Sequence, residues 1–291
     1  MNGAHEYRYL ITGAGYSGRR ILDVLPAANA IGLRKHADSQ PPHTIISADL
    51  DLPIATLPSA ACVIYTVAPS AEHEPDPRLP HFLKALGALP HRLVYFSTTG
   101  VYGDAGGERV HEDDTLNPRS GRAHRRFAAE SLLRQWSADH GVELTILRVP
   151  AIYGPGRLGL ERLRAKEPLL QETDAGPGNR IHVDDLVNCA LAAADPARPP
   201  GVYNVGDGDH RSSTWFATTV ATLAGLSVPE SVPMAEAKRR WSPQRLSFLQ
   251  ESRRVDLRRM YDELRICPRY ADATEGIRAS LNEQPDHVRR P

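Results

Sequence analysis

Tyr7 to Gly18 reads YRYLITGAGYSG, an apolar run that ends in a glycine turn. The run from Tyr7 to Ile11 predicts a short buried strand, and Ser17 to Val24 predicts a helix directly after it. The turn has the G-x-G-x-x-G spacing: the first glycine makes the tight turn, the second lets a pyrophosphate approach the backbone, and the third lets helix and strand pack closely. A glycine turn that serves packing alone is the alternative. We expect a dinucleotide to be bound here by Gly13, Gly15, Tyr16, Ser17 and Gly18.

The composition of the chain limits its class. Its 291 residues are 41% hydrophobic and 24% charged, which suits one large α/β domain or one and a half domains. The formal net charge is zero, so we expect neither a nucleic acid nor a membrane surface as the main partner. Cys62, Cys189 and Cys267 are scattered, and no histidine pair has metal-ligand spacing, so we expect no disulfide framework and no metal. The N-terminal MNGAHEYRYL lacks an apolar signal segment, and no apolar run has membrane-spanning length, so we place the protein in the cytoplasm.

The second predicted strand, Ala30 to Lys35, ends in two basic residues. In a nucleotide-binding βαβ unit an acidic residue at this place binds the ribose 2′-hydroxyl, whereas a basic residue can neutralise a 2′-phosphate. Arg34, with Lys35 or Arg19 in support, therefore favours NADP(H), and NAD(H) remains possible. The alternative is a solvated Arg-Lys pair at a strand end.

Three further strands are predicted at His43 to Ala48, Ala61 to Val67 and Arg92 to Phe96, with a helix at Leu79 to Leu89 between the last two. Alternation of short apolar runs with helices specifies a Rossmann-type, doubly wound parallel sheet that is covered on both faces. Asp49 follows the first of these strands and can reach an adenine amine. The further cofactor contacts expected at the strand ends are Leu50, Thr66, Val67, Ala68, Ser97 and Pro150.

The segment Ser97 to Asp104, STTGVYGD, follows the predicted strand Arg92 to Phe96. Later segments read LRVPAIYGPG from Leu147, RIHVDDL from Arg180 and VYNVG from Val202. Together they resemble the extended short-chain dehydrogenase/reductase family, which is epimerase/dehydratase-like, in order and spacing from Tyr7 to about Leu281. The resemblance implies an NAD(P)-dependent enzyme.

Two departures from the family pattern bear on the activity. Extended members carry GxxGxxG at the first turn, whereas the shorter GxGxxG here resembles an atypical branch of the superfamily. The segment Gly121 to Arg126, GRAHRR, resembles the YeeZ-like subgroup of NAD(P)-dependent epimerase-like proteins. In the family register the catalytic Tyr and Lys of YxxxK correspond to Arg122 and Arg126. Arginine stays protonated and cannot act as the general base.

The family register assigns further roles. Thr98 matches the catalytic Ser/Thr, Arg122 is a fixed cation for a carboxylate or a developing negative charge, and Arg126 keeps the ribose contact. Tyr102 is the third catalytic candidate, with His124, Tyr153, water or the substrate as other proton donors. Thr99, Tyr153 and Arg157 are expected to bind substrate. Each assignment has a structural alternative. Tyr102 and Tyr153 can pack in turns, and Arg157 can be a surface residue. Arg122, Arg125 and Arg126 can form a solvated face, which is the interpretation we prefer for Arg125.

The family register also divides the chain. Residues 1–150 with 179–205 are expected to bind the dinucleotide, residues 151–178 with 206–276 the substrate, and residues 277–291 to form a polar tail. We expect Asp184 and Asp185 to cap the helix that begins at Leu186, and His182 to be structural. Arg253 to Ile266 is predicted as a helix. The family implies a homodimer through helices 79–89 and 122–136.

The sequence therefore predicts an NADP(H)-dependent reductase of a C=O or C=N group in a small, anionic or carrier-tethered metabolite, without the usual Tyr-Lys couple. An NAD(P)-dependent epimerase of a sugar-like substrate is one alternative. The family's dehydratase Asp-Glu pair is Thr99-Gly100 here, which argues against dehydration. A non-catalytic NADP(H) sensor or partner protein is the other.

Overall fold

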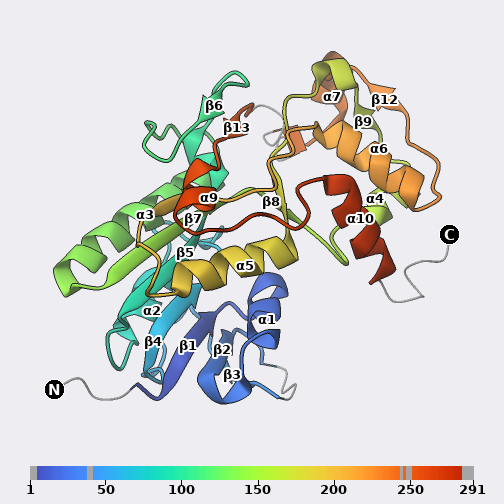
Figure 1. Cartoon of the computed structure of the whole chain (residues 1–291). Coiled ribbons are helices and arrows are strands. Elements are labelled where there is room, and N and C mark those ends of the chain that lie inside the picture. Colours follow the sequence, from blue (N-terminus) through green and yellow to red (C-terminus); the bar gives the residue numbers. More distant parts are fainter. Residues whose placement is uncertain (1–4, 38–41, 243–244, 247–250, 284–291) are drawn as a thin grey trace.

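Seven parallel strands form the centre of the molecule in the computed structural model, which describes residues 5–37, 42–242, 245–246 and 251–283. The strands of this sheet are β1 Tyr7–Thr12, β2 Ala30–Arg34, β3 Thr44–Ser47, β4 Ala60–Tyr65, β5 Arg92–Thr98, β7 Glu143–Val149 and β11 Val202–Asn204. Their order is β3-β2-β1-β4-β5-β7-β11 (Figure 1). Strands β2 and β3 are added in turn on one side of β1. The chain then crosses back, and β4, β5, β7 and β11 are added in turn on the other side. The predicted doubly wound parallel sheet is confirmed.

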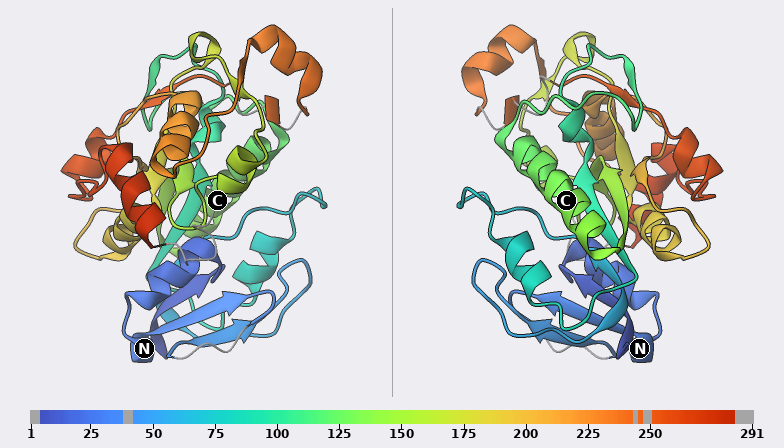
Figure 2. Two further views of the ribbon diagram at one scale, coloured as in Figure 1. Left: turned by 90° about the vertical axis from the view of Figure 1, so that its right-hand side faces the viewer. Right: turned by 90° about the vertical axis from the view of Figure 1, so that its left-hand side faces the viewer.

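Helices cover both faces of this sheet. On one face lie α1 Tyr16–Asp23 and α5 Val183–Ala194; on the other lie α2 Arg78–Lys84 and α3 Gly121–His140. Leu10 and Ile11 are adjacent in β1 but belong to different apolar clusters, because successive side chains of a strand point to opposite faces. Figure 2 shows α1 and α2 on opposite sides of the strands. The apolar runs of the sequence are therefore strands buried on both faces.

A smaller C-terminal portion lies beyond the carboxyl ends of the strands (Figures 1 and 2). Two short parallel pairs, β8 with β10 and β9 with β12, belong to it. Its elements are β8 Ala151–Tyr153, α4 Leu160–Arg164, β9 Leu169–Leu170, β10 Arg180–His182, α6 Ser213–Leu223, β12 Ser231–Val232, α7 Met234–Arg240 and α10 Ala273–Asn282. Ile277 of α10 is fully buried against α6, so residues 277–282 are helical and packed rather than part of a polar tail. The rest of the expected tail, from residue 284, lies outside the described residues.

The predicted helix from Arg253 to Ile266 is wrong. This segment forms the strand β13 Arg254–Val255, paired with β6 Arg109–Val110, and then only the short helix α9 Arg258–Asp262. Asp256 explains the break, because its carboxylate accepts a hydrogen bond from the Arg258 amide at 3.0 Å and so competes with helical hydrogen bonding. Short 3₁₀ turns complete the described elements: η1 Ala27–Asn29, η2 Thr99–Tyr102 and η3 Glu172–Asp174.

Candidate functional site

The glycine turn at the end of β1 requires glycine at two positions. Gly13 has a φ of +92°, which side chains rarely adopt. A Cβ on Gly18 would lie 2.2 Å from the Gly13 carbonyl oxygen, so only glycine lets α1 start this close to the strand. Thr66, just after β4, donates to the same carbonyl at 2.9 Å. The turn is therefore braced between the ends of β1 and β4.

A cavity of about 700 Å³ opens at these strand ends, where the sheet changes direction between β1 and β4. Ligands of doubly wound sheets bind in this position, and the volume falls in the range of small-molecule sites. Predicted site residues that line it are Gly13, Gly15, Tyr16, Ser17, Arg34, Lys35, Asp49, Leu50, Thr66, Val67, Ala68, Ser97, Thr98, Arg122, Arg126, Pro150 and Arg157. Residues that the sequence analysis did not assign to the site are Leu33, Ala48, Asp51, Pro69, Arg78, Phe96, Arg125, Val149 and Ile152.

Four predicted site residues do not line this cavity. Gly18 is packed under the turn, and Thr99 is buried in η2. The Tyr102 hydroxyl donates to Asn204 at 2.7 Å and accepts from Arg148 at 2.8 Å, and burial raises its pKa to about 12. Tyr153 lies in the apolar cluster of the C-terminal portion, 5.3 Å from the Phe216 ring between centroids. Both tyrosines therefore occupy packed positions, which is the structural alternative to a role in the site.

Ionic contacts organise the end of the cavity beside β2 and β3. The Lys35 ammonium lies 2.9 Å from Asp49, and this hydrogen bond raises the lysine pKa. Arg78 binds both oxygens of Asp51, at 2.6 and 3.0 Å, and lowers its pKa to about 2. The sequence did not predict the Arg78–Asp51 pair, because the two residues are 27 positions apart and meet only when the loop after β4 folds back.

Three arginines project into the cavity from one face of α3. Arg122, Arg125 and Arg126 are spaced i, i+3 and i+4, which places them on one side of the helix. Burial lowers the pKa of Arg122. Arg126 is held in place, because one of its guanidinium nitrogens donates to the Phe96 carbonyl at 2.5 Å and to the Val67 carbonyl at 3.2 Å. Arg125 lines the cavity instead of belonging only to a solvated face, in contrast to the interpretation preferred from the sequence.

Ser97 and Thr98 are the last two residues of β5, and they differ in whether the hydroxyl proton is already used in a hydrogen bond. The Ser97 hydroxyl donates to Glu130 at 2.5 Å. The Thr98 oxygen accepts from the Gly100 amide at 3.2 Å, which leaves its proton available for a ligand. Thr98 thus presents a hydroxyl donor to the cavity.

Tyr16 connects the glycine turn with the loop after β8. Its hydroxyl donates to the Pro155 carbonyl at 3.0 Å, and the Arg157 guanidinium stacks over its ring at 3.9 Å from the centroid. Such a cation–π contact fixes both side chains. Arg157 therefore lines the cavity, although its side chain remains exposed to solvent.

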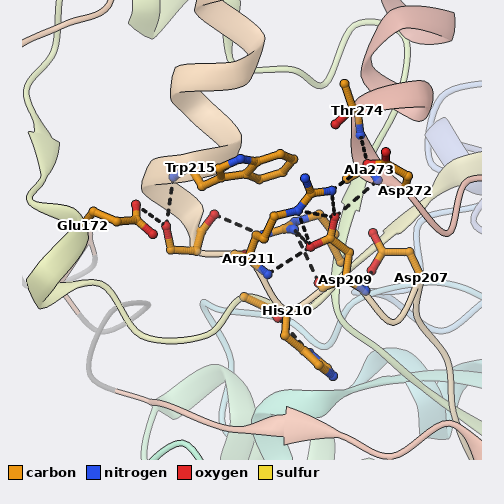
Figure 3. A network of polar contacts seen from close by, with 12 residues as sticks. Glu172, Asp207, Asp209, His210, Arg211, Trp215, Asp272, Ala273 and Thr274 are labelled. Atoms are coloured by element: carbon orange, nitrogen blue, oxygen red, sulfur yellow. Dashed lines mark hydrogen bonds and ion pairs between the residues drawn. The ribbon is translucent and has the colours of Figure 1, made fainter.

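A second polar network lies in the C-terminal portion, outside the residues that line the cavity (Figure 3). Arg211 bridges Asp209 and Asp272 and stacks over Trp215, 3.5 Å from the ring centroid. Beside it, burial raises the pKa of Asp207 to about 8. This network joins the loop after β11 to the starts of α6 and α10.

The expectation that Asp184 and Asp185 cap α5 is wrong. His182 is the N-cap, and its ring accepts from the Asp184 amide at 3.2 Å. Asp185 instead accepts from the backbone amides of Arg269 and Tyr270. The described residues contain no helix long and apolar enough to cross a membrane and no cluster of three or more His, Cys, Asp or Glu suited to a metal ion.

Comparison with known proteins gives consistent similarities. Residues 78–206 match the sequence model of the NAD dependent epimerase/dehydratase family. dTDP-glucose 4,6-dehydratase of Mycobacterium tuberculosis H37Rv is 27% identical over 207 residues, which cover 67% of this chain and 60% of the relative. Protein YeeZ of Escherichia coli K12 is 29% identical over 150 residues, 49% of this chain and 51% of YeeZ. The match thus spans about half to three fifths of these relatives.

Two solved structures resemble the whole described fold. A functionally unknown conserved protein from Silicibacter pomeroyi superposes with a TM-score of 0.79 at 27% identity and covers 94% of this chain and 98% of its own. dTDP-glucose 4,6-dehydratase from Bacillus anthracis, solved in complex with NAD, has a TM-score of 0.75 at 16% identity and covers 95% of this chain and 96% of its own. At this low identity the second likeness concerns the fold alone.

Proposed function

Because residues 78–206 match the sequence model of the NAD dependent epimerase/dehydratase family, we propose that the protein is an NADP(H)-dependent oxidoreductase that reduces a C=O or C=N group in a small anionic or carrier-tethered metabolite. The observation that carries this proposal is the cavity itself. It joins a dinucleotide-type glycine turn at one end to an arginine face at the place of the family's Tyr-Lys pair.

The residues at the turn fit a nicotinamide dinucleotide. A Cβ on Gly15 would have only the Gly13 carbonyl within reach, at 4.0 Å, so the backbone is open to a pyrophosphate here. The N-terminus of α1 attracts the same negative charge. Arg34 and Lys35 would face the 2′-phosphate, while Asp49 and Leu50 would face the adenine. When bound, the cofactor supplies the hydride.

The residues at the other end fit substrate polarisation rather than proton transfer. The Thr98 hydroxyl donates to the reacting oxygen or nitrogen, and Arg122 stabilises negative charge that develops there. Arg126, fixed by the Phe96 carbonyl, orients the nicotinamide ribose. The proton comes from water or the substrate, because Tyr102, Tyr153 and His124 are all absent from the cavity lining.

The charge of the cavity supports an anionic substrate. Seven basic side chains of the described chain line it, against the two carboxylates of Asp49 and Asp51. Both carboxylates are paired with cations at the β2 and β3 end. Arg122, Arg125, Arg126 and Arg157 at the opposite end therefore create a positive potential, which favours a carboxylate or phosphate on the substrate.

Oxidation of NADPH in the presence of candidate substrates tests this function. A keto or imino acid should be turned over steadily, and its neutral methyl ester should be turned over at least about tenfold less efficiently, because the ester lacks the charge that the arginines bind. Arg122→Ala should lower kcat/KM by about 10²-fold. His124→Gln, on the same helix but outside the cavity, is the matched control and should retain turnover.

The other outcomes identify the alternatives. Isomerisation of a sugar-like substrate without net NADPH oxidation would indicate an epimerase, the second candidate, which the match of residues 78–206 to the epimerase/dehydratase family model favours. Tight NADPH binding without turnover of any substrate would indicate a sensor. Full turnover by Arg122→Ala would contradict the role given to Arg122.

The assembly and location are parts of the same proposal. We place the protein in the cytoplasm, in keeping with the buried free thiols of Cys62 and Cys189. A homodimer through α2 and α3 is supported by Phe127 and Leu132, which are more than one third exposed on α3. Light scattering should report a dimer for the wild type and a monomer for Phe127→Glu.

A further inference from the structure

A continuous chain of ion pairs lies at the end of the cavity beside β2 and β3. Lys35 lies 2.9 Å from Asp49 and 3.4 Å from Asp51. Asp51 in turn accepts two hydrogen bonds from Arg78, through Nε at 2.6 Å and Nη2 at 3.0 Å. All four residues line the cavity with Arg34. Three cations therefore face two carboxylates at this end.

Asp51 is the centre of this chain. Its carboxylate contacts both Lys35 and Arg78, whereas Asp49 contacts only Lys35 among these two cations. The Asp51 side chain is 16% exposed and that of Lys35 is 52% exposed, so solvent screens the Asp51 charge less. The bidentate geometry also keeps Arg78 in one orientation.

We propose that Asp51 sets the selectivity of the cavity between nicotinamide dinucleotides with and without a 2′-phosphate, because it neutralises Lys35 and Arg78, the two cations beside Arg34. This inference rests on the proposed function. A 2′-phosphate must compete with Asp51 for both cations and is repelled by its charge. A cofactor with a free 2′-hydroxyl meets neither cost. Asp51 thereby limits a preference for NADP(H) that Arg34 and Lys35 would otherwise make strong.

Arg78 also makes a hydrogen bond that does not depend on Asp51. The effect of Asp51 on selectivity can therefore be measured separately from the effect on the position of Arg78. Its Nη1 donates to the Ala68 carbonyl at 3.0 Å, which ties the loop after β4 to the start of α2. That contact does not involve Asp51. When the Asp51 charge is removed, Arg78 stays at the cavity wall and its remaining nitrogens can turn to a phosphate.

Calorimetric titration of the full chain with NADPH and with NADH tests the proposal. In Asp51→Asn the ratio of the NADH dissociation constant to the NADPH dissociation constant should rise about three- to fivefold, the effect of about one partly screened ion pair. Adenosine 2′,5′-bisphosphate and adenosine 5′-monophosphate should show the same change, because they carry only the adenosine end. Asp49→Asn should raise the ratio less. Asp139→Asn, on an exposed turn of α3, is the charge control and should leave the ratio unchanged.

If Asp51→Asn weakens the binding of NADPH and NADH equally, or if the ratio falls, the proposal is overturned. Asp51 would then only stabilise the structure of the cavity wall. If Asp51→Asn does not fold, as judged by its thermal transition, an unchanged ratio in Asp49→Asn overturns the proposal and a raised one supports it. A wild-type protein that binds no nicotinamide nucleotide would overturn the proposed function together with this inference, whereas binding with an unmoved ratio would overturn this inference alone.

Discussion

Glu130 of α3 and Arg148 of β7 form an ion pair behind the cavity, with 3.1 Å between Glu130 Oε2 and Arg148 Nη2 and side chains that are 1% and 2% exposed. The same glutamate accepts from Ser97 in the cavity wall, and the same arginine donates to Tyr102. Helix α3 is therefore fixed against β5 and β7 through buried charges. This contact helps to position Arg122, Arg125 and Arg126 of α3 at the cavity.

Arg148→Met should lower the free energy of unfolding by about 3–5 kcal/mol, because it leaves the buried Glu130 carboxylate without its main compensating charge. Arg134→Met is the matched control. Arg134 pairs with the same carboxylate at 3.0 Å but is 44% exposed, so its loss should cost less than about 1 kcal/mol. Urea unfolding of both variants measures the difference; equal losses would contradict the assignment.

Gly18→Ala should destabilise the protein by about 1–3 kcal/mol, since its Cβ would meet the Gly13 carbonyl at 2.2 Å. Gly15→Ala should change the free energy of unfolding by less than about 0.5 kcal/mol, because the space around it is open. It should still weaken NADPH binding, since the new methyl group occupies the approach to the backbone. Thermal melting with and without NADPH distinguishes the two effects. A stable Gly18→Ala protein would show that the turn can relax.

Thr98→Val should lower kcat/KM by about 10²-fold in NADPH oxidation, because it removes the hydroxyl that the cavity offers to the substrate. Tyr102→Phe should affect stability more than turnover. It removes the hydroxyl between Arg148 and Asn204 and should cost about 1–3 kcal/mol of unfolding free energy. A loss of turnover in Tyr102→Phe as large as in Thr98→Val would restore Tyr102 as a catalytic residue.

Asp207 should make stability pH-dependent. Burial raises its pKa from an ordinary value of 3.8 to about 8, so between these values the folded protein holds a proton that the unfolded chain releases. The free energy of unfolding of the wild type relative to that of Asp207→Asn should therefore be highest below about pH 4. It should fall as the pH rises toward 8, by up to about 1.4 kcal/mol per pH unit. Denaturant unfolding of both proteins from pH 5 to 8 measures this slope. A constant difference between them would contradict it.

The sheet was predictable because its signals are local. Each strand is an apolar run buried on both faces, and the carboxyl ends of parallel strands meet at one edge. Residues at the carboxyl ends of strands, such as Thr66 and Ser97, could therefore be assigned to one cavity from the sequence.

The features that were missed depend on contacts between distant segments. Arg78 meets Asp51 only through the path of the loop after β4. Arg125 is an exception, because its spacing from Arg122 and Arg126 on α3 already places it on the same face of the helix. The helix expected at Arg253 to Ile266 failed for a different reason. Asp256 offers the backbone a local hydrogen bond, and residues 254–255 pair with β6, which overrides helix propensity.

The stack of Arg157 on Tyr16 gives the two ends of the cavity a shared part. Tyr16 begins the helix that would receive the pyrophosphate, and Arg157 belongs to the loop on the substrate side. A ligand that shifts the Tyr16 ring also shifts the cation above it and strains the hydrogen bond to Pro155. Movement of the Tyr16 ring is therefore coupled to movement of Arg157, so the glycine turn and the loop after β8 are mechanically linked across the cavity.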